Sequence, residues 1–156
     1  LSKALTTTPE GFVLHSRVWP RKFDDGVALD GAWDRLTPVW FTEREAVSTL
    51  GGSDLLLYLC AQGSAREWSQ LSLVCDVNQL LHSRATFDWL AVAGQIERAH
   101  DSRGLLLGLV LVQALFGTVL PAEIAALIAK DGQITARTAE VRARLRSRVP
   151  ESGAAR

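Results

Sequence analysis

The sequence has little of several features that would each point to a particular class of protein. Its 156 residues include no methionine, only two cysteines and only three histidines, which lie far apart in the chain. These counts argue against a disulfide-stapled scaffold, and the spacing provides no zinc site. The formal net charge is zero, which argues against a dedicated nucleic-acid-binding or membrane-surface protein.

Long hydrophobic runs are scarce as well. The most apolar stretch, residues 105–120, is interrupted by Gln113 and is shorter than the roughly 20 residues that a membrane-spanning helix needs. Residues 1–10 are rich in Ser and Thr and lack the apolar core of a signal peptide. We therefore expect a cytoplasmic protein without a membrane partner. Only three of the 17 basic residues are lysine, a bias typical of GC-rich bacterial genomes.

The chain does contain enough apolar residues for a core, at 47% of the total. In the first part of the chain these residues have the pattern of short strands. Residues 10–19 are β-branched and aromatic and end at Pro20, which favours a strand over that range. Asp-Gly pairs typical of turns follow, and residues 39–41 and 46–50 predict two further short strands.

Helical signals dominate from Ser53 onward. Ser53 is typical of a helix N-cap, and Gly63 is expected to end the helix that begins there. Ser64 and Glu67 have the spacing of a capping box, which predicts a second helix with Trp68 on its apolar face. Four more helices are expected over about residues 89–99, 103–116, 121–130 and 135–148. Asp88 is expected to cap the first of these, and Gly117 to end the second.

The expected fold is therefore α+β and mainly α. Residues 1–52 form a small β-rich segment with connecting loops, residues 53–149 form a bundle of five to six helices, and residues 150–156 form a disordered tail. Residues 137–156 hold six arginines and two acidic residues, so this end of the chain is basic. Because no aromatic residues alternate with these arginines, we favour a solvated helix face over nucleic-acid binding.

An acidic residue in the middle of an apolar helix is the most unusual polar position. Asp76 lies near the predicted face that carries Leu73 and Leu80, where an unpaired carboxylate would be costly. Two explanations remain open. Asp76 forms a structural salt bridge or hydrogen bond, with Arg66 or Arg84 as candidate partners, or it contacts a substrate or nucleotide.

Two other candidates are better explained by structure than by chemistry. The Gly51-Gly52-Ser53 sequence precedes a helix N-terminus, where free amides can hold an anion, but the same sequence suits an ordinary turn and no lysine follows it. Cys60 and Cys75 both lie on predicted apolar helix faces, where thiols are usually inert.

A series of motifs runs in a fixed order along the chain. A hydrophobic strand containing His15 is followed by a leucine-rich helix, and the later members are Leu59-Cys60, Gly63, Arg66, Trp68, Leu71, Asp76, Asp88-Trp89 and Leu120-Pro121. This order resembles the uncharacterised nucleotidyltransferase family of bacteria, over about residues 10–130. The resemblance implies that a complete member uses Mg²⁺ to transfer a nucleoside monophosphate from an NTP to an acceptor, whose identity is unknown.

The polar residues that match the family pattern are His15, Arg66 and Asp76, and the resemblance implies that they contact substrate. They are the candidate site residues of this chain. No catalytic residue and no metal ligand is expected, and no cofactor is expected for this chain by itself.

The departures from the family pattern concern its chemistry. Val13, Gln62 and Ala65 stand where the family has an acid, a histidine and a lysine, and the Gly-Ser turn and Asp-x-Asp pair of the superfamily are missing. Together with an opening Leu1, this leads us to expect the C-terminal region of a nucleotidyltransferase, with a remnant of its sheet, that is inactive alone. The alternative is a degenerate helical interaction module without chemistry. If sheet neighbours are missing, the strand over residues 10–19 is expected to pair with another copy.

Overall fold

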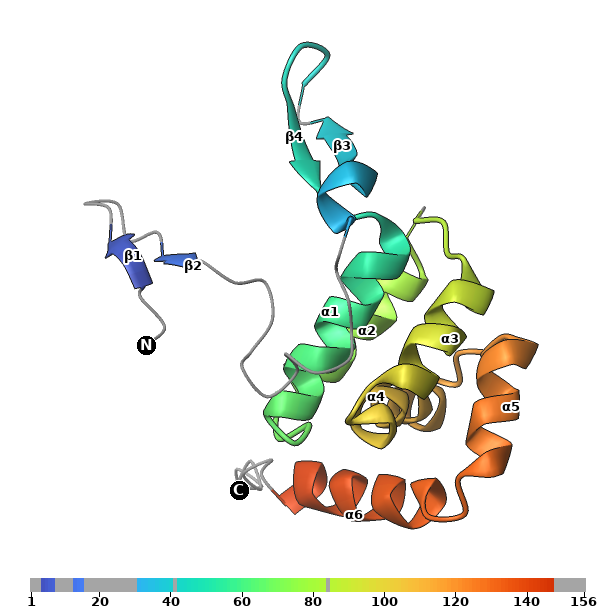
Figure 1. Cartoon of the computed structure of the whole chain (residues 1–156). Coiled ribbons are helices and arrows are strands. Elements are labelled where there is room, and N and C mark those ends of the chain that lie inside the picture. Colours follow the sequence, from blue (N-terminus) through green and yellow to red (C-terminus); the bar gives the residue numbers. More distant parts are fainter. Residues whose placement is uncertain (1–3, 8–12, 16–30, 41, 84, 148–156) are drawn as a thin grey trace.

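The computed structural model describes residues 4–7, 13–15, 31–40, 42–83 and 85–147. Within these ranges the fold is α+β and mainly α, which confirms the expected class (Figure 1). Six α-helices follow two short antiparallel hairpins and one turn of 3₁₀ helix. The predicted tail, residues 150–156, lies outside the described residues.

Two pairs of strands make up the β structure. Strand β1 (Ala4–Thr7) pairs with β2 (Val13–His15), and β3 (Thr37–Trp40) pairs with β4 (Ala46–Thr49). The 3₁₀ helix η2 (Ala32–Arg35) leads into β3. The strands expected at residues 39–41 and 46–50 are thus confirmed, with small shifts at their ends. The strand expected over residues 10–19 is described only as β2, one edge of which pairs with β1.

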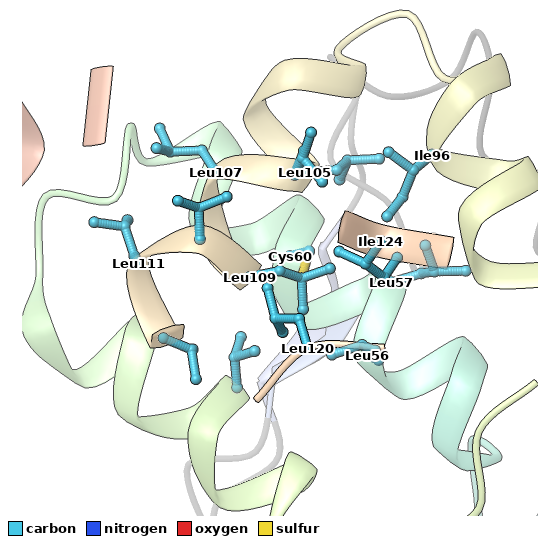
Figure 2. Packing of buried hydrophobic residues seen from close by; sticks show 14 of the residues in the cluster. Leu56, Leu57, Cys60, Ile96, Leu105, Leu107, Leu109, Leu111, Leu120 and Ile124 are labelled. Carbon is cyan, nitrogen blue, oxygen red and sulfur yellow. The ribbon is translucent and has the colours of Figure 1, made fainter. Parts of the chain in front are cut away.

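The helices form one bundle around a central apolar helix. They are α1 (Gly52–Ala65), α2 (Leu71–Leu81), α3 (Trp89–Arg98), α4 (Ser102–Phe116), α5 (Ala122–Lys130) and α6 (Ile134–Ser147). Helix α4 contacts each of the other five, and its residues 105–112 are all buried (Figure 2). The most apolar run of the sequence is therefore the core of the bundle. Among the described residues, no helix is long and apolar enough to cross a bilayer.

The end of α1 differs from the expectation. The helix does not stop at Gly63 but continues to Ala65, and α2 begins only at Leu71, so the predicted capping box at Ser64 and Glu67 is wrong. The cause is Trp68, which is 1% exposed and lies in the connection between the two helices. Burial of this large ring requires a sharp reversal of the chain, which local spacing could not indicate.

Local signals identified other helix ends correctly. The Asp88 carboxylate accepts a hydrogen bond from the Ala91 amide and caps α3. Gly117 ends α4 in the left-handed conformation with φ 74°, where glycine is favoured. Figure 1 shows the β3–β4 hairpin projecting from the end of the bundle at which α1 begins, while α6 crosses the other end.

Candidate functional site

A cavity of about 540 Å³ opens where α1 begins. Its walls come from η2, the start of β3, the first turn of α1, the segment before α3 and one face of α3; we call it the α1–α3 cavity. The polar residues that line it include Arg35, Ser53, Asp54, Asp88, Gln95 and Arg98. A volume of this size suits a small molecule.

An ion pair fixes the α1 wall of the cavity. Arg35 donates from Nε to Asp54 Oδ2 at 3.1 Å and from Nη2 to Asp54 Oδ1 at 2.9 Å. Asp54 is only 4% exposed, so its charge is taken out of water and satisfied by this two-point contact. The hydrogen bond to the carboxylate raises the pKa of Arg35 above its usual value. Arg35 therefore stays cationic, and it neutralises the acid in the first turn of α1.

The start of α1 is joined closely to the segment that leads into α3. The Asp88 amide donates to Ser53 Oγ at 2.9 Å, and a Cβ atom added at Gly52 would lie 2.4 Å from the carbonyl oxygen of Thr86. Only glycine permits this approach of the two backbones. The glycine at the first position of α1 thus has a structural cause and needs no bound anion to explain it.

The α3 wall presents one stripe of side chains. Asp88, Ala91, Gln95 and Arg98 are spaced by three, four and three residues, which places them on the same helix face. The Gln95 Oε1 atom is buried and has no hydrogen-bond partner among the described residues. Arg98 is exposed, and no carboxylate in the described part of the chain pairs with it. Two polar groups on this wall, Gln95 Oε1 and the Arg98 guanidinium, therefore have no partner in the described part of the chain.

A second cavity of about 540 Å³ lies at the opposite end of α1, between the α1–α2 connection, α4 and α6. We call it the α4–α6 cavity. Most of its charged groups pair with one another or with the rim: Arg137 with Glu140 at 2.9 Å, Arg103 with Asp131 at 2.7 Å, and Arg144 with the carbonyl oxygen of Glu67 at 2.6 Å. The Arg144 contact ties α6 to the α1–α2 connection, and the pairing of the other charges leaves this cavity with fewer unpaired polar groups than the α1–α3 cavity.

A family model described as an uncharacterised nucleotidyltransferase matches residues 12–117. The chain belongs to this family. No curated protein and no solved structure shows significant similarity to it. Every residue that lines the α1–α3 cavity lies within the matched segment, whereas the α4–α6 cavity also depends on α6, which lies beyond it. The α1–α3 cavity is therefore the better candidate site of this nucleotidyltransferase-family chain.

Of the three candidate site residues, Arg66 and Asp76 are not brought together at either cavity. His15 ends β2, and its side chain lies outside what the structure describes. Arg66 follows α1 and is exposed, and Asp76 is exposed on α2. Arg66 and Asp76 form no side-chain hydrogen bond or ion pair with each other among the described residues, and neither lines the α1–α3 or the α4–α6 cavity. Their proposed contact with substrate stays a prediction.

The expectation that Asp76 is buried is wrong. The buried positions of α2 are Leu73, Val74 and Val77, while Leu80 is only half-buried. The apolar face of α2 is therefore rotated by about one residue from the predicted stripe through Leu73 and Leu80. As a result the Asp76 carboxylate points to solvent. An exposed carboxylate needs no partner, so the predicted salt bridge or hydrogen bond with Arg66 or Arg84 has no physical requirement. Arg84 itself lies outside the described residues.

The described residues do not favour metal binding or thiol chemistry at the candidate site. Among the described residues, no group of His, Cys, Asp or Glu side chains is arranged to hold a metal ion. Cys60 is buried, and burial raises the pKa of its thiol to about 12, so it stays protonated and unreactive. Sequence reasoning missed Arg35, because its partner Asp54 lies 19 residues away and no local pattern connects them. Gln95 and Arg98 could have been found from their helical spacing to the capping Asp88.

Proposed function

We propose that this nucleotidyltransferase-family chain binds the acceptor substrate of a nucleotidyl transfer in the α1–α3 cavity. The observation that carries the proposal is the position of that cavity, which combines polar side chains with apolar surface, is of small-molecule size and lies wholly inside the family segment. In the reaction, a nucleoside monophosphate moves from an NTP to the acceptor. The acceptor class is a small polar molecule, because the walls offer arginine, carboxylate and amide groups.

The proposal does not assign the binding of the nucleotide or of Mg²⁺ to the described residues. Metal-assisted phosphoryl transfer needs carboxylates that hold the ion. The described acidic residues do not fit this requirement, since they form no cluster suited to a cation, and no step is assigned to them. Val13, Gln62 and Ala65 replace the acid, histidine and lysine of the family pattern. We therefore propose that the chain binds the acceptor but does not complete the transfer by itself.

The binding step can be tested with a matched pair of cavity variants. The purified chain is incubated with a low-mass cell extract and washed, and retained compounds are identified by mass spectrometry. Ala91→Trp places an indole inside the cavity, whereas Ala126→Trp adds the same indole to the exposed face of α5. We expect a retained compound with the wild type and Ala126→Trp, and loss of it with Ala91→Trp. Equal retention by both variants, or none by the wild type, would refute acceptor binding in this cavity.

The transfer step has its own test. The chain is incubated with labelled NTPs, Mg²⁺ and the same extract, and we expect no labelled product above the rate without protein. Robust transfer by the purified chain would show that it is sufficient for catalysis, which contradicts that part of the proposal and leaves the binding part intact.

A second candidate function is protein interaction without chemistry. The observation in its favour is the β3–β4 hairpin with η2, which exposes Trp33 at 72%, Trp40 at 64% and Val47 at 57%. Large apolar side chains gathered on a projecting element are typical of interaction surfaces. If this alternative holds, the α1–α3 cavity retains no compound, and the chain associates with a partner protein through the β3–β4 hairpin.

A further inference from the structure

Two polar groups of the α3 wall that have no partner among the described residues, on Gln95 and Arg98, indicate which kind of acceptor the cavity binds. Gln95 Oε1 is buried without a hydrogen-bond partner among the described residues. A buried polar atom that makes no hydrogen bond destabilises the fold, and a donor on a bound molecule would remove that cost. Gln95 lines the α1–α3 cavity, so a rotation of its side-chain amide would present Oε1 to a donor on a ligand bound there.

Arg98 stands next to Gln95 on the same face of α3, three residues further along. Its guanidinium lies back over the helix, because Nη1 would be 3.4 Å from a Cβ atom added at Gly94. Arg98 lines the cavity, and its guanidinium lies against Gly94, the residue that precedes Gln95. An arginine in this position can make two parallel hydrogen bonds to a carboxylate or phosphate.

The other charges around the cavity do not cancel this cation. Asp54 is neutralised by Arg35, and Glu97, which adjoins Arg98 in sequence, pairs with Lys130 at 2.9 Å. Asp88 lies at the far end of α3, ten residues away, or about 15 Å along the helix axis. The positive end of the α1 dipole faces the Asp88 end of the cavity, where Ser53 accepts from the Asp88 amide. Arg98 is therefore a cation that no described carboxylate neutralises at its own end of the cavity.

We propose that Arg98 and Gln95 form a subsite for an anionic, hydroxylated acceptor. Arg98 binds the carboxylate or phosphate of the acceptor, and Gln95 Oε1 accepts a hydrogen bond from a hydroxyl group close to that anion. This inference rests on the proposed function, since it concerns the same cavity, and it narrows the acceptor to small hydroxy acids or phosphorylated polyols.

The test measures anion binding directly and requires no transfer. Acetate, glycolate, inorganic phosphate and glycerol 3-phosphate are titrated into ¹⁵N-labelled chain at constant ionic strength, and the Gln95 side-chain amide is followed by NMR. The Arg98→Gln variant removes the cation, and Arg146→Gln removes an exposed arginine of α6 far from the cavity. The comparison of acetate with inorganic phosphate shows which anion the subsite prefers.

We expect saturable shifts with at least one of the two hydroxylated probes in the wild type and in Arg146→Gln. Affinity should fall by about tenfold or more in Arg98→Gln, because a charge-assisted hydrogen bond is lost. Each hydroxylated probe that binds should bind more tightly than its parent anion. Equal affinity in the two variants, no advantage from the hydroxyl group, or no saturation in the wild type would overturn the subsite. Saturable anion binding combined with unchanged compound retention by Ala91→Trp would instead refute the proposed function and leave the subsite standing.

Discussion

At the scale of single residues, Trp68 determines how α1, α2 and α4 meet. Its ring lies between two glycines, since a Cβ atom at Gly63 or Gly108 would come within 2.3 or 2.2 Å of ring carbons. Its indole N–H donates to the carbonyl oxygen of Gly104 at 2.9 Å. Glu67 and Trp68 both adopt positive φ, at 52° and 51°, a conformation that is unfavourable for residues other than glycine. Burial of the indole is the interaction that offsets this strain.

This packing predicts the effect of adding one methyl group. Gly63→Ala should destabilise the chain by about 1–3 kcal/mol, because the Trp68 ring is fully enclosed and cannot yield without moving α4. Gly132→Ala is the matched control, since nothing lies within 4 Å of a Cβ atom there. Urea unfolding followed by circular dichroism measures both. The interpretation fails if the two variants have the same free energy of unfolding.

At the scale of elements, the sequence predicted the features whose cause is local. The Asp88 cap of α3 and the Gly117 end of α4 depend on residues within one turn, and both were found. The end of α1 depends on Trp68 meeting Gly108 of α4, 40 residues further along, and it was missed. The same division holds at the candidate site. The start of α1 was found to within two residues, although its N-cap is Gly51 and the expected cap, Ser53, lies inside the helix. The Arg35–Asp54 pair, which joins two elements, was not found.

Asp131 connects three helices through one carboxylate. It follows α5, accepts a hydrogen bond from Arg103 of α4 at 2.7 Å, and accepts another from the Gln133 amide just before α6. The contact with Arg103 is the main cause that lowers the pKa of Asp131 below 3.8, and the Gln133 amide contributes as well. The folded chain therefore binds this proton less readily than the unfolded chain does.

The sign of the pH dependence follows from this lowered pKa. The contribution of Asp131 to stability is present above pH 3.8 and is lost as the pH falls through the lower folded value. Arg103→Gln should weaken this acid sensitivity, with an effect below about 1 kcal/mol because the arginine is half exposed. Thermal unfolding from about pH 5 to about pH 2 measures the change, and Arg146→Gln serves as the control. Parallel curves for the two variants would show that the Arg103 contact does not set the pKa.

At the scale of the whole molecule, the chain combines a well-packed bundle with a hairpin that has little support. Strands β3 and β4 pair only with each other among the described residues, and nearly all of their residues are exposed. A two-stranded hairpin is at most marginally stable in water without further packing. The outer edge of β4, Ala46–Thr49, contains neither a charge nor a proline, the two devices that usually protect an edge strand.

These properties predict reversible self-association through β4. An unprotected edge can pair with the same edge of a second copy, and the cross-strand pair Val39–Val47 would then gain apolar contacts on one face. Val47→Lys should reduce association, because a charge on an edge strand opposes pairing, whereas Ala125→Lys on the exposed face of α5 should leave it unchanged. Sedimentation velocity over a concentration series measures the effect. A clean monomer of the wild-type chain at the highest concentration would contradict the prediction. It would also weaken the alternative function of protein interaction, since the exposed apolar hairpin would then not associate with a second copy.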